Sequence, residues 1–160
     1  MITLILRRQV VERMRAALHE AGRREIGGVL MAEHTGPNQF EVLDITIHGR
    51  GTIAYFLRRV EEAVTRLKSF FVRANHDYVK FNYLGEWHSH PSFELEPSGR
   101  DDRSIREIVE DQDVGANFVV LLIVKLADSG ELLIHRGRGV VASVVPAAIS
   151  MNKGAILDNF

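Results

Sequence analysis

The chain has 160 residues, of which 46% are hydrophobic and 26% are charged, and its formal net charge is -1. This length and composition are typical of one globular domain, and the near-neutral charge argues against a general attraction to nucleic acid. The absence of cysteine excludes a disulfide framework, a thiolate zinc site and a cysteine nucleophile.

The sequence shows no sign of a membrane or export segment. No apolar run is long enough to cross a bilayer, and the apolar segment 2–6 is too short for the core of a signal peptide and lacks a preceding basic segment. We therefore expect a cytoplasmic protein with no membrane partner.

The first half of the chain alternates helical and strand patterns. Residues 9–21 carry apolar side chains on one helix face, and Gly22 is well placed to end that helix. Residues 25–32 and 40–48 read as strands, and the turn residues between them predict a hairpin. From about residue 56 to 74, apolar residues at helical intervals predict a helix that faces the core.

The second half is richer in strands. Residues 78–90 are predicted to form a strand that stops at Pro91, because proline cannot donate a ladder hydrogen bond. A helix is predicted from 99 to about 112. Further strands are predicted at 117–126 (central and buried on both faces), at 131–135 (its antiparallel partner) and at 140–145. Residues 146–160 show no clear period and are expected to be a short helix or a tail.

The strand at 78–90 ends in a candidate metal site. His88 and His90 are one residue apart on an extended segment, so their imidazoles project from the same face and can share one ion. Asp101 follows after a short loop, and two nitrogens with one carboxylate form a ligand set of catalytic zinc sites. A pair of satisfied, partly buried histidines is the alternative interpretation.

Ser98 and Asp101 also have the spacing of a capping box at the start of the following helix. That interpretation needs no metal. The two are compatible, since a helix N-terminus could hold Asp101 rigidly while its carboxylate faces the ion.

The whole pattern, His88-x-His90, seven intervening residues and Ser98-x-x-Asp101, resembles the JAMM motif of the JAB/MPN metalloprotease family, in a form similar to bacterial deubiquitinase-like members. Glu25, followed by Gly27 and Gly28, matches the family's upstream glutamate. The resemblance spans roughly residues 1–140.

The resemblance implies the fold and the roles of the site residues. It implies a single JAB/MPN-like α/β (α+β) domain over residues 1–145, a mixed β-sheet flanked by helices with cytidine-deaminase-like layering, followed by the tail 146–160. One Zn²⁺ per chain is expected on His88, His90 and Asp101. Ser98 resembles the family serine that hydrogen-bonds the developing oxyanion.

The general base is open from the residues alone. Glu86 lies on the same strand face as His88 and is closer to it in sequence than Glu25 is. The family resemblance selects Glu25 as the base and leaves Glu86 as a candidate supporting residue or a sheet-surface carboxylate.

Three residues are candidates for substrate binding: Gly27, Gly28 and Trp87. The glycines would let a substrate backbone approach closely, or they serve tight sheet packing instead. An aromatic side chain such as Trp87 beside a strand end is more often a packing residue than a groove residue.

The implied activity is a zinc-dependent isopeptidase or peptidase that cuts after the C-terminal glycine of a ubiquitin-like protein. The expected partners are that protein or its conjugate and activating and conjugating enzymes of the same pathway. The alternatives are a catalytically silent scaffold or binding module of the same fold and a nucleic-acid-associated protein like the RadC branch, against which the near-neutral charge argues.

Overall fold

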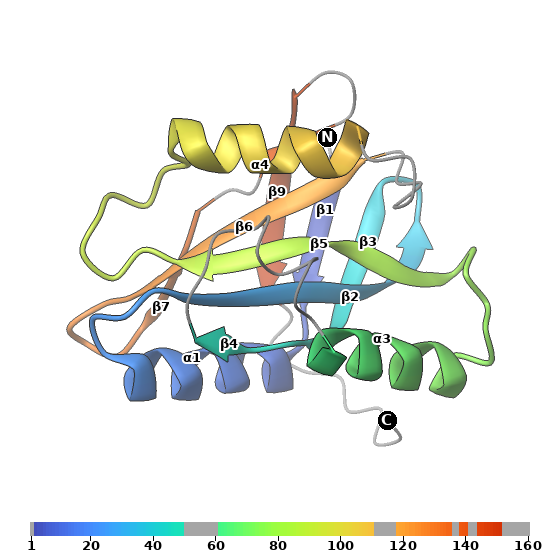
Figure 1. Ribbon diagram of the computed structural model, residues 1–160, viewed down its shortest axis with the longest axis horizontal. Helices are drawn as coiled ribbons and strands as arrows, with labels where there is room; N and C mark the ends of the chain where they lie inside the picture. Colours follow the sequence, from blue (N-terminus) through green and yellow to red (C-terminus); the bar gives the residue numbers. More distant parts are fainter. Residues whose placement is uncertain (1, 50–60, 111–117, 136–137, 141–143, 152–160) are drawn as a thin grey trace.

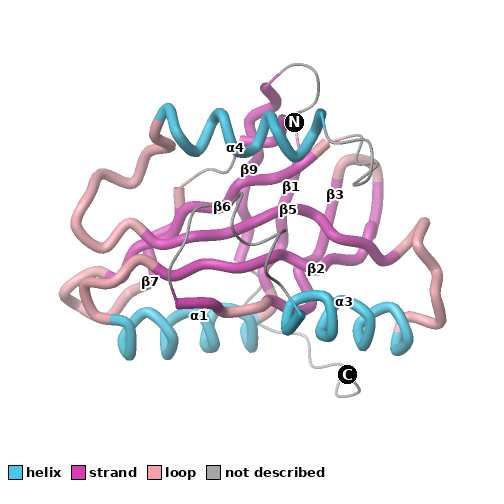
Figure 2. The backbone as a smooth tube through the Cα atoms, in the orientation of Figure 1, coloured by secondary structure: helices cyan, strands magenta, loops and turns pink. Residues whose placement is uncertain are grey.

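The computed structural model describes residues 2–49, 61–110, 118–135, 138–140 and 144–151. Helices and strands alternate along the chain and build one mixed sheet with helices packed on it (Figures 1 and 2). In chain order the elements are β1 (Ile2–Leu6), α1 (Arg8–Ala21), β2 (Ile26–Gly36), β3 (Gln39–Ile45), β4 (His48–Gly49), α3 (Glu61–Arg73), β5 (Phe81–Ser89), α4 (Gly99–Glu110), β6 (Val119–Leu126), β7 (Leu132–Ile134), β8 (Arg138–Val140) and β9 (Val144–Met151).

The sheet curls back on itself because β3 pairs with β1 on one side and with β2 on the other. The pairings run from β2 through β3, β1, β9, β8, β6 and β5 back to β2. The largest apolar cluster lies inside this curl and is closed by Val10, Met14 and Leu18 of α1. The predicted α/β fold, a mixed sheet flanked by helices, is confirmed.

The other two helices pack on the outer face of the sheet. Ile105 and Ile108 of α4 contact the odd-numbered apolar residues of β6, while Phe70 of α3 packs against Val29 and Met31 of β2. The even-numbered residues of β6 face the inner cluster. The expected burial of this central strand on both faces is therefore confirmed.

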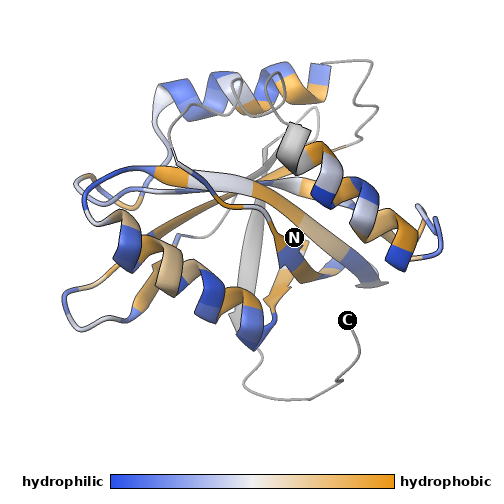
Figure 3. Cartoon of the chain, turned by 60° about the horizontal axis from the view of Figure 1, so that its bottom comes forward, coloured by the Kyte–Doolittle hydropathy of each residue, from blue (hydrophilic) through white to orange (hydrophobic). Residues whose placement is uncertain are grey.

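Apolar residues on one face and residues that end a helix explain where the helices form. The helices show hydrophilic and hydrophobic stretches in alternation (Figure 3). α1 ends at Gly22, whose φ of 61° suits glycine and whose N–H donates to the carbonyl oxygen of Leu18. The predicted end of this helix is confirmed, and the hairpin of β2 and β3 turns at Asn38 with φ 57°.

The strand that carries the histidines begins later than predicted, at Phe81 instead of residue 78. Asn75 and His76 adopt positive φ values of 52° and 57°, and the Lys80 N–H donates to the carboxylate of Asp77, so a turn occupies this stretch. The helix predicted over residues 56–74 corresponds to α3, and the helix predicted from 99 to about 112 corresponds to α4. Residues 56–60, 111 and 112 of these predictions lie outside the described residues.

The C-terminal expectations need correction. The single strand predicted at 140–145 is replaced by β8 and β9, which pair antiparallel. Residues 146–151 continue β9, which pairs parallel with β1, so a short helix or tail is wrong for these residues. Residues 152–160 lie outside the described residues. Residues 2–6, for which the sequence pattern predicts no element, form β1.

Within the residues that the structure describes, no helix combines the length and the apolar character needed to cross a membrane.

Candidate metal centre

The end of β5 positions the two histidines. β5 lies between β2 and β6, where His88 is paired with Gly27 on one side and with Ile123 on the other. His90 follows the strand, and its N–H still donates to the carbonyl oxygen of Val124 at 3.0 Å. Pro91 comes next and cannot continue the ladder. The two imidazoles are thus held at a strand end, with their Nε2 atoms 3.0 Å apart.

Asp101 reaches the histidines from the first turn of α4. Its Oδ1 is 3.5 Å from the Nε2 of His88, and its Oδ2 is 3.8 Å from the Nε2 of His90. One donor atom from each of the three residues lies within 4.8 Å of the others. The sequence therefore predicted correctly which three side chains come together, and this group could hold one metal ion.

The loop after Pro91 holds the acid in place. The Oδ2 of Asp101 accepts hydrogen bonds from the N–H and the hydroxyl of Ser98, both at 2.7 Å, and the Ser98 Oγ accepts from the Asp101 N–H at 3.3 Å. This is the reciprocal geometry of a capping box. A carboxylate at a helix N-terminus is also stabilised by the helix dipole. Capping and ligation are compatible here, because Oδ1 faces His88.

The neutral state of His88 suits the binding of a divalent cation, which a protonated imidazole would repel. The Nδ1–H of His90 donates to the carbonyl oxygen of Glu94 at 2.8 Å, which leaves the His90 Nε2 with its lone pair facing the site. Burial is the main cause that lowers the pKa of His88 to about 4, while Asp101 opposes this and raises it. His88 is therefore neutral at pH 7. Two imidazole nitrogens and one carboxylate are a donor set that suits zinc.

Glu25 and the three candidate ligands line one cavity of about 470 Å³. Glu25 is exposed and directly precedes β2. Glu86, the other candidate for the general base, is 1% exposed and is not in the wall of this cavity. The idea that Glu86 is a sheet-surface carboxylate is therefore wrong, and access to the cavity favours Glu25 over Glu86 as a residue that can reach a substrate.

The three residues expected to bind substrate are instead packed against other parts of the protein. Trp87 is 1% exposed, belongs to the inner apolar cluster and donates its indole N–H to the carbonyl oxygen of Thr46. A Cβ on Gly27 would overlap the carbonyl oxygen of Trp87, and one on Gly28 would overlap that of Thr46. These placements argue against a substrate contact for Trp87 and support tight sheet packing as the role of both glycines.

Ser104 was not singled out in the sequence. It is 7% exposed and lines the cavity from α4. Its position three residues after Asp101 places it on the same face of the helix, so helical spacing could have found it. Phe93 lines the same cavity, is 61% exposed and packs edge-on against His90, with the ring centroids 6.2 Å apart.

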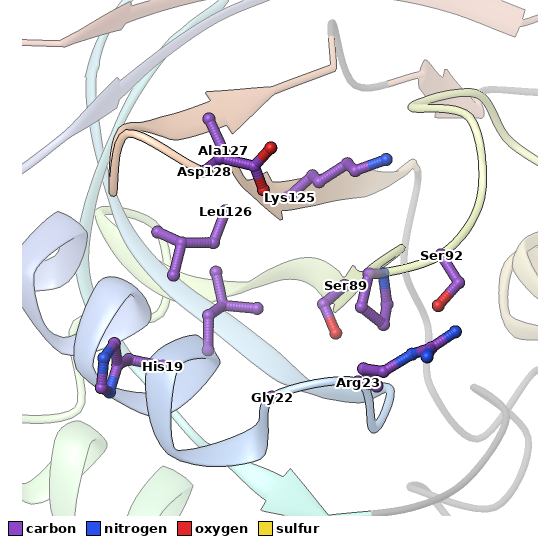
Figure 4. A pocket seen from close by; sticks show the side chains of 11 residues that line it. His19, Gly22, Arg23, Ser89, Ser92, Lys125, Leu126, Ala127 and Asp128 are labelled. Atoms are coloured by element: carbon purple, nitrogen blue, oxygen red, sulfur yellow. The ribbon is translucent and has the colours of Figure 1, made fainter.

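A second cavity, of about 590 Å³, lies beside the end of β5 and is lined by Ser89 and not by His88 or His90. Figure 4 shows Ser89 on β5, Lys125 on β6 and Arg23 after α1 around it. The Lys125 ammonium donates to the carbonyl oxygen of Phe93, and the Ser89 hydroxyl accepts from the N–H of Ile26. These two polar groups thus support the loop and the strand that carry the metal site.

Comparison with known proteins identifies the family of this chain. A family model described as prokaryotic homologs of the JAB domain matches residues 7–135. No curated protein matches the chain significantly. Among solved structures, the chain is similar to the solution structure of protein DSY2949 from Desulfitobacterium hafniense, with a TM-score of 0.59, 19% sequence identity and 94% of each chain covered. That likeness concerns the fold, whereas the family model matches most of the sequence. The chain belongs to the family of prokaryotic homologs of the JAB domain.

Proposed function

We propose that this protein is a zinc-dependent isopeptidase or peptidase that hydrolyses the bond after the C-terminal glycine of a ubiquitin-like protein. The observation that carries the proposal is the convergence of His88, His90 and Asp101, with donor atoms within 4.8 Å of one another, in a cavity that Glu25 also lines. Membership in the JAB family is consistent with hydrolase chemistry at such a site.

The residues have separate tasks in this proposal. The two histidines and Asp101 hold the metal, which when bound would supply an acidified water and polarise the scissile carbonyl. Glu25 accepts a proton from the attacking water and returns it to the leaving nitrogen, so that a carbon–oxygen bond forms as the carbon–nitrogen bond breaks. Ser98 keeps Asp101 in place through its N–H and its hydroxyl. We propose that the hydroxyl turns from Asp101 to donate to the developing oxyanion, while the N–H continues to hold the acid.

The proposed substrate is an extended C-terminal tail that ends in glycine. A slender tail suits a cavity of about 470 Å³ better than a folded surface does, and the exposed ring of Phe93 offers it an apolar contact. Because backbone groups of Trp87 and Thr46 fill the space beside Gly27 and Gly28, the tail would be held by other residues of the cavity wall. Activating and conjugating enzymes of the same pathway are the proposed partners.

The test is incubation of the purified protein, with and without a chelator, with a panel of ubiquitin-like proteins fused or conjugated at their C-terminal glycine. We expect release of the free C-terminal glycine that stops on chelation and returns when zinc is added. Elemental analysis of the same preparation separates the alternatives. Bound zinc without cleavage of any fusion would contradict the proposed substrate, and a preparation that takes up no zinc would favour a scaffold of this fold.

A further inference from the structure

Four polar atoms, in three side chains on the outer face of the sheet, are buried without a hydrogen bond of good geometry among the described residues. They are the hydroxyl of Tyr83, both carboxyl oxygens of Glu86 and the Nδ1 of His88. All three residues are on β5, and Glu86 and His88 are paired with the outward-facing Leu121 and Ile123 of β6. A polar row therefore runs beneath the outer helices towards the metal site.

Glu86 is flanked by apolar strand neighbours, and the Tyr83 hydroxyl is a polar group that interacts with it from the same strand. Its strand neighbours are Val29 on β2 and Leu121 on β6, both buried. The cluster under α3 and the cluster under α4 both include Tyr83, the other end of the row. Burial raises the pKa of Glu86 well above its usual range. A leucine would suit this position better for stability, so the carboxyl group calls for another explanation.

The tautomer that His88 needs for metal binding explains why a carboxyl group is buried at Glu86. With its Nδ1–H donating to the carbonyl oxygen of Glu94, a neutral imidazole at His90 accepts at Nε2 from the Nε2–H of His88, 3.0 Å away. In this arrangement the buried Nδ1 of His88 carries no proton. A metal on both Nε2 atoms requires the opposite tautomer of His88, with its proton on Nδ1, and that N–H then needs an acceptor.

We propose that Glu86 is a positioning residue that accepts the Nδ1–H of His88 when the metal is bound, directly or through one buried water, and so holds the Nε2 of His88 towards the ion. Residues two apart on a strand are roughly 7 Å apart at their Cα atoms, a distance that a glutamate side chain and one water can bridge. Either charge state of the carboxyl group offers an oxygen that can accept. The proposal rests on the metal centre and not on cleavage of any substrate.

The test compares Glu86→Gln, which keeps an acceptor, with Glu86→Leu, which removes it. We expect Glu86→Leu to weaken zinc binding by at least about tenfold in a chelator competition, whereas Glu86→Gln stays close to the wild type. In long-range proton–nitrogen spectra of the zinc-loaded proteins, the wild type and Glu86→Gln should show a slowly exchanging His88 Nδ1–H. In Glu86→Leu this proton should exchange rapidly.

Thr46→Val is the matched control, because it removes a different buried polar group of the sheet, one that does not line the cavity of the ligands. It should leave zinc affinity and the His88 signal unchanged. The proposal is overturned if Glu86→Leu matches the wild type in both measurements, or if Thr46→Val alone loses the protected proton. A wild type that binds no zinc would instead contradict the metal centre itself.

A measurement on the wild type alone covers the case in which Glu86→Leu does not fold. Zinc loading should shift the carboxyl carbon resonance of Glu86. The resonance of Glu33, which lies in the second half of β2 and forms an ion pair with Lys80, should not shift. A Glu86 resonance that does not respond to zinc would overturn the proposal.

Discussion

The hydroxyl of Ser98 and the carboxylate of Asp101 lie 2.7 Å apart, and the backbone N–H groups of the two residues add a hydrogen bond in each direction. The same acid therefore begins α4 and faces two imidazoles. Because the loop between His90 and Ser98 is short, fixing the start of the helix also fixes the distance from the acid to the histidines. The contacts that cap α4 therefore also position the acid in the candidate metal site.

Replacing Ser98 by alanine should accordingly affect stability and metal binding together. We expect Ser98→Ala to lose about 1 kcal/mol of unfolding free energy, the usual value of an N-cap. Zinc affinity should fall by about tenfold or more, because Asp101 loses a partner that orients it. Chemical denaturation and chelator competition measure the two effects, with Ser92→Ala as the control in the same loop. A variant with normal zinc affinity but greatly reduced turnover would show instead that Ser98 acts mainly on the oxyanion.

Asp101→Asn tests the ligand set. The asparagine keeps the size of the side chain and can still cap α4, but it removes the negative charge that faces His88 and His90. We expect substoichiometric zinc by elemental analysis, with the thermal stability of the metal-free protein little changed. Asp102→Asn, at the exposed neighbouring position, should bind zinc like the wild type. Full zinc occupancy in Asp101→Asn would show that the acid is not a ligand.

Glu25→Gln tests the general base. The residue lines the cavity of the three ligands, and the amide cannot accept and return a proton as a carboxylate does. We expect one zinc per chain and a loss of turnover of at least about 100-fold. Glu94→Gln removes another carboxylate from the wall of the same cavity and should keep most of the activity. A fully active Glu25→Gln would mean that the base has been assigned to the wrong residue.

The site was more predictable from sequence than the sheet. Local spacing places His88, His90 and Asp101, because a strand and a helix N-terminus have fixed geometry over a few residues. The same period-two argument places Trp87 on the opposite face from both histidines, so its burial was also within reach of the sequence.

The pairing of β1 with β9 was not within reach. The two strands lie at opposite ends of the chain, and β9 contains Pro146 and no alternating pattern that would mark it as a strand. Only the long-range register shows that residues 146–151 belong to the sheet. In the same way, the closeness of Gly28 to Thr46 depends on how the chain returns after β3.

The low pKa of His88 predicts a pH dependence of the metal-free protein. The folded chain holds His88 neutral down to about pH 4, whereas the unfolded chain binds this proton near pH 6.5. The contribution of His88 to stability is therefore fully present above about pH 6.5 and is lost as the pH falls towards 4, by at most about 3 kcal/mol. The raised pKa of Glu86 acts in the opposite sense, since its contribution is lost as the pH rises above the unfolded value of 4.5.

The difference between the wild type and His88→Asn isolates the histidine, because Glu86 is present in both. Denaturation with a chelator present, at several pH values between 4 and 7, should give a difference in unfolding free energy that grows with pH and levels off above about 6.5. A difference that does not change with pH would contradict the buried, neutral state of His88.

The two glycines of β2 predict a contrast within one sheet. A Cβ at Gly28 would overlap the carbonyl group of Thr46, which is backbone and cannot turn aside, so Gly28→Ala should lose about 3 kcal/mol of unfolding free energy. Gly49, on the neighbouring strand β4, has no heavy atom within 4 Å of an added Cβ, and Gly49→Ala should be close to neutral. Equilibrium denaturation of both variants checks this. If Gly28→Ala keeps full stability yet loses activity towards a ubiquitin-like substrate, the space beside Gly28 serves the substrate and not the sheet.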